Sequence, residues 1–506
     1  MANESAGRAT GNGASEAILR RTMVAVVFGA LMSMVDTTIV NIAIRSLAVR
    51  LHADLSSVQW VVTGYLLALA AALPLAAWLC NRFGARQVYV WSIAVFTLAS
   101  AACGLSASLG ELVAFRVVQG VAGALTMPAG TMIIVPLAGR ERMARVMGTF
   151  TIPIVMAPVF GPVIGGLLLE HAGWQWIFLV NLPFGLAAVP LALWLLPRDR
   201  VTPAPRPDFA GLLLVSGGSA AVTYGLAEAG SAVIRLALPI AIGAILLAMF
   251  VVRSARIPQP LLDVRLYRSP AYAASSLMNF ALGAVVFGGM ILMPLYYQEV
   301  RHLDPVVTGL LVAPTGIGVA ITSRLAARLT DRSGSGRTAL LGALVSAAGT
   351  IPFVAIGPAT SYAWLIAASL VRGAGIGLCM IPAMAAVYRA IPAAKVSDGT
   401  TQVNVLNRLG GSTGTAVFTV VLQQALAGGA TAAAGAAAFG GAFRWALGAA
   451  LLAAAPAVLL ARVEARLARA TPADASHAAP GPAGTSPAAS PPVPAPPAAR
   501  ESASSG

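Results

Sequence analysis

Charge is scarce in this sequence of 506 residues. Charged side chains make up 10% of the chain and hydrophobic ones 58%, whereas about a quarter of an ordinary soluble domain is charged. Such a chain cannot cover itself with a water-facing surface, so we expect it to lie in a lipid bilayer. Its net charge of +15 would suggest nucleic acid in a soluble protein. Here the charges fall in short gaps between apolar runs, and we expect no nucleic-acid partner.

The residue types that build nucleotide and metal sites are also few. The only lysine, Lys395, is followed by Val, so no glycine-rich loop ending in Gly-Lys-Ser/Thr is present to bind phosphates. The histidines lack metal-ligand spacing, and the cysteines have no paired spacing that would indicate disulfides. We expect no enzyme activity, no metal and no cofactor, which leaves an ion gradient, or no energy source at all. The residues concerned are His52, His171, His302, His477, Cys80, Cys103 and Cys379.

Long apolar runs dominate the chain instead. A helix needs about 20 apolar residues to cross a bilayer, and fourteen candidate spans predict an all-α integral membrane protein. The run after the polar first 21 residues is too long for a cleaved signal peptide and is taken as the first span. The expected spans are residues 22–44, 58–79, 88–108, 111–134, 146–169, 174–196, 209–228, 233–252, 271–295, 305–327, 338–356, 360–382, 399–424 and 440–463.

Positive charge alternates between the gaps that separate these spans. Loops on the cytoplasmic side of membrane proteins carry an excess of Lys and Arg, and every second gap is rich in Arg. Both termini are therefore expected to be cytoplasmic, which agrees with an even number of spans. The rich segments are residues 8–21, 82–86, 140–145, 198–206, 253–268, 328–337, 389–395 and 462–469.

A diverged repeat suggests how the spans are grouped. An Arg-rich turn at residues 81–86 follows the second span, and a similar one at residues 331–337 follows the tenth. If the turns correspond, each half has six helices and the seventh and eighth are inserted between the halves, as in transporters with parallel repeats. The expected parts are an N-terminal arm (1–21), an N-terminal half (22–196), a linker with two inserted helices (197–270), a C-terminal half (271–463) and a disordered cytoplasmic tail (464–506).

Asp36 is the only one of eighteen acidic residues that falls well inside an expected span. Charged groups at that depth are costly and usually functional, so Asp36 is a candidate proton carrier. Glu228, near the outer end of the seventh span, is the rival. The alternative for Asp36 is a structural carboxylate that is hydrogen-bonded to Thr37, Thr38 or another helix.

The residues around Asp36 resemble a family signature. The segment MVDTTIVNIA (34–43) is similar to the first-helix signature of the fourteen-helix drug:proton antiporters of the major facilitator superfamily. In the fourth span, RVVQGVAGA (116–124) resembles the superfamily's Arg-x-x-Gln-Gly motif, whose arginine is associated with proton transfer. The resemblance implies that Asp36 and Arg116 couple transport to protons, since a guanidinium stays charged and can pair with a carboxylate. An arginine bonded to backbone carbonyls is the alternative.

Two more segments extend the resemblance. APVFGPVIGG (157–166) is similar to the antiporter motif, and WQWIFLVNLP (174–183) opens the sixth span as in this family. Small residues at a spacing of four let another backbone approach closely, although membrane packing alone would explain any single one of them. The antiporter-motif residues are Gly161, Pro162, Gly165 and Gly166.

The turn after the second span departs from the family pattern. Asn81 stands where the family has Asp, and Ala77 replaces a Gly, while Arg82, Gly84 and Arg86 are retained. In the family this Asp is thought to anchor a gating contact between the halves. Asn81 is therefore expected either to weaken the closed state or to act through hydrogen bonds.

Candidates for lining a substrate site are aromatic and amide side chains. A pocket near mid-membrane between the halves would use apolar and aromatic lining with a few polar groups, although core or lipid-facing packing explains a single aromatic equally well. The amides can face either substrate or another helix, and interhelical hydrogen bonding is expected for Arg372. The candidates are Trp60, Tyr65, Phe150, Asn404 and Asn407, with Arg408 next to the last of these.

The resemblance implies a major facilitator fold and a secondary active transporter. The expected function is export of a hydrophobic, cationic or amphipathic small molecule in exchange for protons across a bacterial-type cell membrane. Proton-coupled uptake of a metabolite uses the same scaffold, and a non-transporting membrane sensor is the alternative from a different class. The antiporter motif argues against uptake, and the presence of both Asp36 and Arg116 argues against a sensor.

Overall fold

Every regular element in the described part of the chain is helical, as the apolar runs predicted. The computed structural model describes residues 2–198, 208–228, 233–392, 395–426 and 432–470. Its α-helices are α1 (Ala2–Arg50), α2 (Leu55–Val58), α3 (Trp60–Ala72), α4 (Ala76–Phe83), α5 (Ala85–Gly104), α6 (Leu109–His171), α7 (Gln175–Leu179), α8 (Asn181–Leu195), α9 (Phe209–Ala227), α10 (Val233–Arg256), α11 (Pro270–Leu295), α12 (Pro305–Ser333), α13 (Ser335–Val354), α14 (Tyr362–Ala390), α15 (Val396–Leu426), α16 (Ala432–Leu452) and α17 (Ala454–Ala470). Short turns of other helix types are η1 (Leu73–Leu75), η2 (Val264–Arg268) and η3 (Tyr296–Val300).

Twelve helical segments of the described chain are long and apolar enough to cross a bilayer. The other two expected spans, 399–424 and 146–169, lie in α15 and in the second part of α6. α15 has the length of a span but includes Asn404, Asn407 and Arg408, which lower its mean hydropathy. The helices therefore account for fourteen spans. Residues 146–169 are mainly apolar and carry no charge, so of these two spans only α15 is hard to recognise by apolar composition.

α6 differs from the expectation because its helical backbone runs without interruption through 63 residues. Eight of the eleven residues in the expected gap at 135–145 are Arg, Ala, Leu, Glu or Met, which favour helix and outweigh Pro136 and Gly139. A straight helix of this length would measure about 95 Å, yet Leu112 near one end and Leu168 near the other belong to the same apolar cluster. The segment therefore doubles back, as two antiparallel spans would.

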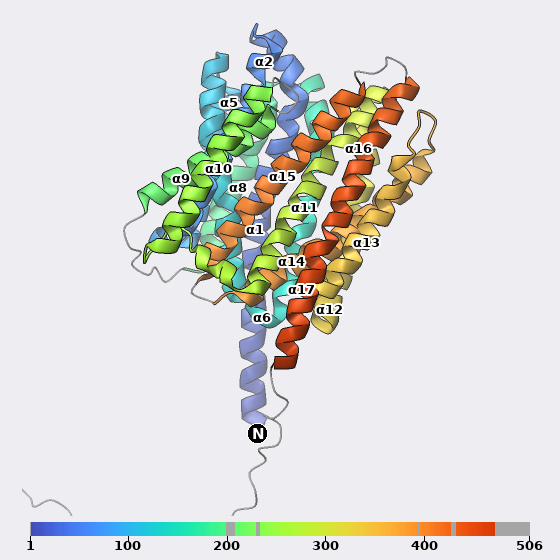
Figure 1. The fold of residues 1–506 in the computed structure, drawn as a ribbon. Coiled ribbons are helices and arrows are strands. Elements are labelled where there is room, and N and C mark those ends of the chain that lie inside the picture. The colour runs from blue at the N-terminus through green and yellow to red at the C-terminus, as the bar shows by residue number, and fades with distance from the viewer. Residues whose placement is uncertain (1, 199–207, 229–232, 393–394, 427–431, 471–506) are drawn as a thin grey trace, which may run out of the picture. The chain divides into compact units, whose positions relative to one another are not determined.

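The inserted helices α9 and α10 pack on each other (Figure 1), and α9 also packs on α3 of the N-terminal half and on α15 of the C-terminal half. The backbones of α9 and α10 approach closely, because a Cβ placed on Gly243 would lie 2.8 Å from the carbonyl oxygen of Gly218. Tyr224 of α9 stacks on Trp60 at the start of α3, with ring centroids 6.2 Å apart. Most of α10 is exposed, as expected of a helix that faces lipid.

The two Arg-rich turns correspond in backbone conformation as well as in sequence. Gly84 joins α4 to α5 with φ +90°, and Gly334 joins α12 to α13 with φ +87°. Only glycine adopts this combination of positive φ and extended ψ without strain. The repeat inferred from sequence thus has a structural counterpart at the same place in each half.

Replacing Gly84 by Ala is expected to destabilise the fold by about 1–3 kcal/mol, because a Cβ strains this backbone conformation. Gly110→Ala is a matched control: Gly110 is helical, and its added Cβ would meet no atom within 4 Å. The control should leave stability unchanged or raise it slightly. Thermal unfolding of both variants in detergent measures the difference, and equal midpoints would contradict a strained turn.

The N-terminal segment is described almost from its first residue, whereas most of the C-terminal segment is not. α1 begins at Ala2, so the polar arm expected at 1–21 continues the first spanning helix. Residues 1–465 form one compact unit and 466–506 another, of which only the end of α17 is described. The expected disordered tail thus lies largely outside the described residues.

Candidate functional site

Asp36 lies on α1 and is completely buried. Among the Asp and Glu side chains that the structure describes, it alone has no exposed surface, whereas Asp263 and Asp398 are each 9% exposed. A buried carboxylate without partners would be very costly. Its surroundings therefore decide whether it can serve as a titrating group.

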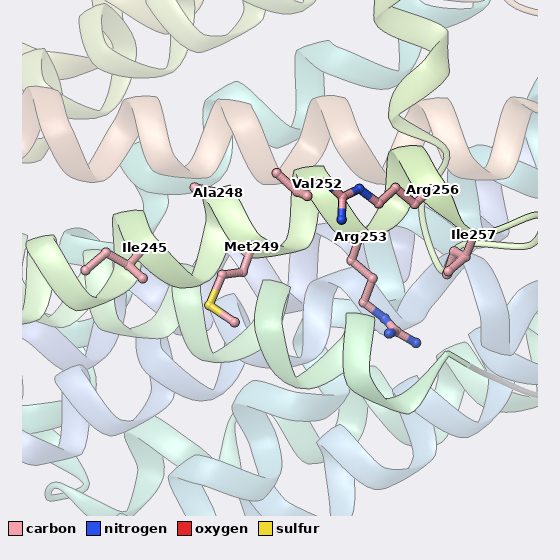
Figure 2. A pocket seen from close by; sticks show the side chains of 7 residues that line it. All are labelled: Ile245, Ala248, Met249, Val252, Arg253, Arg256 and Ile257. Atoms are coloured by element: carbon pink, nitrogen blue, oxygen red, sulfur yellow. The ribbon is translucent and has the colours of Figure 1, made fainter.

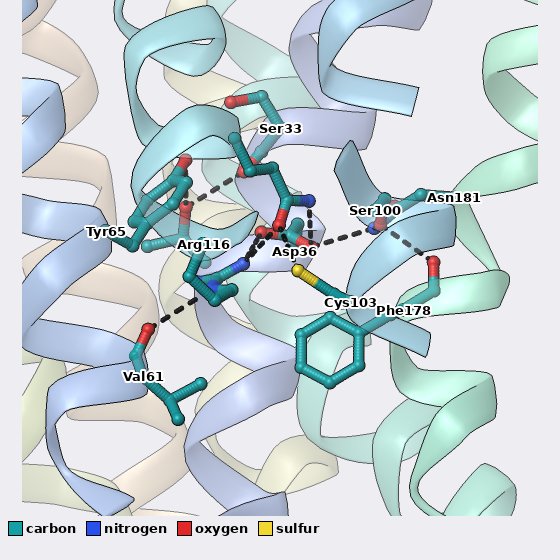
Figure 3. A network of polar contacts seen from close by, with 11 residues as sticks. Ser33, Asp36, Val61, Tyr65, Ser100, Cys103, Arg116, Phe178 and Asn181 are labelled. Carbon is teal, nitrogen blue, oxygen red and sulfur yellow. Dashed lines mark hydrogen bonds and ion pairs between the residues drawn. The ribbon is translucent and has the colours of Figure 1, made fainter. Parts of the chain in front are cut away.

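Both carboxylate oxygens of Asp36 accept hydrogen bonds from other helices (Figure 3). Arg116 Nη1 of α6 lies 2.7 Å from Oδ2. Oδ1 accepts from Gln119 Nε2 at 3.0 Å and from Asn181 Nδ2 of α8 at 2.8 Å. The carboxylate thus has a cation on one oxygen and two neutral amides on the other.

Arg116 is itself held by more than its acid partner. Its Nε donates to the carbonyl oxygen of Val61 on α3 at 3.1 Å, and Nη1 also donates to Gln119 Oε1 at 2.9 Å. The guanidinium carbon lies 4.2 Å from the centre of the Tyr65 ring, a favourable position for a cation over an aromatic face. The expected pairing of Asp36 and Arg116 is present in the structure, and Arg116 also bonds the backbone.

A second layer fixes the amides that bind Asp36. Asn181 Nδ2 also donates to Ser100 Oγ at 3.0 Å, and Ser100 donates to the carbonyl oxygen of Phe178 at 2.9 Å (Figure 3). Cys103 Sγ lies 3.7 Å from Gln119 Oε1. Gln119 and Asn181 were inside segments matched to family motifs but had no predicted role. A buried amide in an apolar span is the signal that would have singled them out.

Of the three aromatic candidates, only Tyr65 reaches this network. It is 1% exposed, and its hydroxyl lies 3.5 Å from Thr37 Oγ1 of α1. Trp60 is 45% exposed and packs on α9 instead. The side chain of Phe150 lies outside the described residues. The structure therefore joins one predicted aromatic to the Asp36 site and places another near the inserted helices.

The amide candidates on α15 have different surroundings. Asn407 Nδ2 donates to the carbonyl oxygen of Asn279 on α11 at 2.9 Å, so this residue faces another helix. Asn404 Nδ2 is buried and has no hydrogen-bond acceptor within the described part of the chain. Neither belongs to the Asp36 network.

The antiporter motif lies in the second part of α6. Gly161 and Gly165 are buried, as a close helix contact would require. A Cβ on Gly166 would lie 3.7 Å from Val306 of α12, so this end of the motif faces the C-terminal half. The side chain of Pro162 lies outside the described residues.

Comparison with known proteins gives a consistent family. The model of the Major Facilitator Superfamily matches residues 26–415. The chain belongs to the major facilitator superfamily. A multidrug resistance protein B homolog of Mycobacterium tuberculosis is 36% identical over 411 residues, which cover 80% of this chain and 76% of that protein. The tetracenomycin C resistance and export protein of Streptomyces glaucescens is 32% identical over 413 residues, covering 79% and 75%.

Solved structures agree with the major facilitator fold. The proton:xylose symporter XylE covers 89% of this chain and 96% of its own, with a TM-score of 0.60 and 14% sequence identity. At this identity the likeness concerns the fold alone. The predicted family and fold are therefore confirmed, and the chain is a multi-pass membrane protein of the transporter superfamily.

The turn between α4 and α5 of this superfamily member links the two halves through Asn81. Ser397 at the start of α15 donates to Asn81 Oδ1 at 3.0 Å. Arg86 donates to the carbonyl oxygen of Leu193 on α8, whereas Arg82 is exposed. The residue that replaces the family's Asp thus makes a neutral hydrogen bond between the halves, one of the two expected outcomes.

Removing either partner of this bond is expected to weaken the closed contact by about 0.5–1.5 kcal/mol, the usual net value of a neutral hydrogen bond. Asn81→Ala and Ser397→Ala should therefore each raise the fraction of molecules in which this contact is open, and by the same amount. The distances between spin labels on the two halves report that fraction. Because both substitutions remove one shared bond, the double variant should match either single one. Additive effects would show that Asn81 does not act through Ser397.

Charged residues gather beside this contact. Lys395 Nζ lies 3.2 Å from Asp263 Oδ2, just before η2, and 3.6 Å from Asp398 Oδ2 on the first turn of α15. Burial raises the pKa of Asp398 to about 6, with Lys395 opposing the shift and Asp263 adding to it. We call Asn81, Asp263, Lys395, Ser397 and Asp398 the seam cluster, since they join the two halves and the linker.

A groove of the described surface lies elsewhere, along α10 (Figure 2). Its volume is about 570 Å³, and all its lining residues come from α10 and the residue that follows it, between Ile245 and Ile257. An apolar groove along one exposed helix suits lipid chains rather than a substrate enclosed between helices. No group of His, Cys, Asp and Glu in the described chain has the arrangement of a metal site.

Proposed function

We propose that this protein is a secondary active transporter that exports hydrophobic or amphipathic small molecules in exchange for protons. The observation that carries the proposal is Asp36, completely buried and bound by Arg116, Gln119 and Asn181. The resistance and export functions in the names of its relatives support the same conclusion. No catalytic step and no cofactor besides the proton gradient are part of the proposal.

The two oxygens of Asp36 have different tasks in this proposal. Oδ1 is held by two amide donors, which remain good partners whether the group is charged or neutral. Oδ2 faces Arg116, whose attraction depends on the negative charge. The proton therefore binds at Oδ2, and its arrival replaces the ion pair.

Arg116 can stay buried after this change because it has other acceptors. The carbonyl oxygen of Val61, Gln119 Oε1 and the ring of Tyr65 all remain in contact with the guanidinium. A buried cation that lost its sole partner would be strongly destabilised. The alternative contacts lower that cost, so both protonation states can be populated.

Protonation at this site acts on four helices together. Asp36 belongs to α1, Tyr65 to α3, Arg116 to α6 and Asn181 to α8. Separation of Oδ2 from Arg116 would change the packing of all four, and cores respond to such changes by switching between discrete arrangements. This links proton binding to the movement of the N-terminal half against the C-terminal half.

The proposal also includes the orientation of the protein in the membrane and the direction of transport. In the proposal both termini are cytoplasmic, which the alternating Arg-rich segments favour, and the seam cluster then lies on the cytoplasmic side. Protons enter the cell as the substrate leaves. Uptake of a metabolite would need the opposite relation between proton and substrate movement, and a sensor would move neither.

Proteoliposomes with the purified full chain test the function directly. With an acidic interior, an antiporter accumulates substrate as protons leave, whereas a symporter accumulates it only when the exterior is acidic. The panel contains two dyes that share a dansyl group, namely dansyltaurine, a permanent anion, and dansylaminoethyl-trimethylammonium, a permanent cation. Accumulation of either dye with an acidic interior supports the proposal. Accumulation with an acidic exterior alone, or in neither case, overturns it.

A further inference from the structure

Positive charge exceeds negative charge in the middle of the C-terminal half. The charge of Asp36 is matched by Arg116. Arg372 on α14 and Arg408 on α15 form no ion pair with any acid of the described chain, and Arg372 has only one long contact, 3.5 Å from Nη2 to the carbonyl oxygen of Val285. Unpaired charges are costly at such depth and mark ligand or ion pathways. They therefore require an explanation that the Asp36 site does not supply.

The two arginines lie at the same level of α11. Arg372 contacts Val285, and a Cβ on Gly289 would lie against its guanidinium. Arg408 stands 5.3 Å from the ring of Phe287. Residues 285–289 form little more than one helical turn near the middle of α11, so both cations lie near mid-membrane.

Arg408 is the arginine that a ligand can reach. Its side chain is partly exposed, whereas Arg372 is buried. Apart from the aromatic face of Phe287, it has no partner among the described residues. Arg408 thus keeps N–H donors that have no acceptor in the described structure.

Asn404 adds a second donor on the same helix face. It lies one turn before Arg408 on α15, a spacing that places two side chains side by side. Its Nδ2 is buried and has no acceptor in the described structure, although buried amides almost always find one. A guanidinium and an amide, adjacent and both lacking acceptors, match a ligand group that has acceptor oxygens and a negative charge.

We propose that Arg408 and Asn404 bind an acidic group of the transported molecule, so that the preferred substrates are amphipathic anions. The inference rests on the proposed transport function and names its substrate class. Sequence reasoning favoured a cationic or amphipathic substrate, whereas the only fully buried carboxylate among the described residues is already paired with Arg116.

Binding of the two dansyl dyes to the purified full chain in nanodiscs tests the substrate class. They differ only in the charged head group, and their fluorescence reports binding without transport. The wild type should bind dansyltaurine about tenfold or more tightly than the cation, the scale of one charge-assisted hydrogen bond. Arg408→Gln should remove this preference, Arg408→Lys should keep part of it, and Asn404→Ala should reduce it less. Arg324→Gln, an exposed arginine of α12, is the matched control and should change nothing.

The outcomes separate this inference from the proposed function. Equal or tighter binding of the cation by the wild type, a preference that survives Arg408→Gln, or binding of neither dye overturns the inference. If the cation alone is accumulated under an acidic interior, antiport stands and the anion site is wrong. If dansyltaurine binds through Arg408 but neither gradient drives its accumulation, the site stands and the antiport proposal fails. Retained preference in Arg408→Lys shows that loss in Arg408→Gln is not due to misfolding.

Discussion

Asp36→Asn abolishes gradient-driven accumulation of the dansyl dyes in proteoliposomes, to the level of vesicles without protein, if Asp36 carries the coupled proton. Asparagine has the same shape but cannot ionise. Its amide nitrogen must also face a donor, whichever way it is turned, because Arg116 lies on one side and Gln119 and Asn181 on the other. Downhill exchange and dye binding can persist, since the variant site no longer needs to gain or lose a proton.

Glu228→Gln is the control for this experiment. Glu228 follows the last residue of α9 and is half-buried at the C-terminal end of that helix, without a place in the Asp36 network. Its replacement should have the smaller effect on accumulation. If Asp36→Asn still moves dye uphill at the native rate, Asp36 is structural and the proton site has to be sought elsewhere.

Arg116→Lys is expected to reduce export about tenfold or more, even though the positive charge is kept. The guanidinium reaches the carbonyl of Val61 through Nε and both Asp36 and Gln119 through Nη1, while its flat face covers Tyr65. An ammonium group is a single rotating point that cannot hold these directions together. Loss of one hydrogen bond to a charged group corresponds to about 1.5–3 kcal/mol, consistent with an effect of this size.

Drug susceptibility of cells that produce each variant at equal level provides the measurement. Arg324→Lys, an exposed arginine of α12, is the matched control and should resemble the wild type. Wild-type resistance in the Arg116→Lys cells would show that charge alone suffices at this position. The directed hydrogen bonds of Arg116 would then stabilise the fold without being needed for transport.

Most of the fold could be predicted because the bilayer imposes a simple rule on composition. Apolar runs of spanning length gave eleven helices close to their observed places, and the twelfth observed span, Ala434–Arg466, extends the predicted run 440–463 at both ends. The gap inside α6 was different: residues that favour helix continue through it, and composition alone does not show where such a helix turns. The polar span α15 was predicted although its mean hydropathy is low, because glycines and family-like residues accompany its amides.

The site could be predicted in part for a related reason. Asp36 and Arg116 are conspicuous because charges are rare in spans, and their pairing follows from opposite sign. Gln119, Asn181 and Ser100 are common polar residues, and their roles depend on contacts between helices up to 145 positions apart. The different surroundings of Asn404 and Asn407 likewise depend on the rotation of α15 against α11, which no short motif encodes. The burial of Tyr65 and the exposure of Trp60 likewise depend on contacts between helices.

A single lysine gives the seam cluster a chemical property of its own. Apart from any α-amino group, Lys395 is the only primary amine in the chain, and it lies between Asp263 and Asp398 in this conformation. An acylating reagent such as an N-hydroxysuccinimide ester would therefore modify one side chain, at the place where the halves meet. Its reaction rate would follow the release of that amine from the two carboxylates, so the native protein could report each opening without an introduced label.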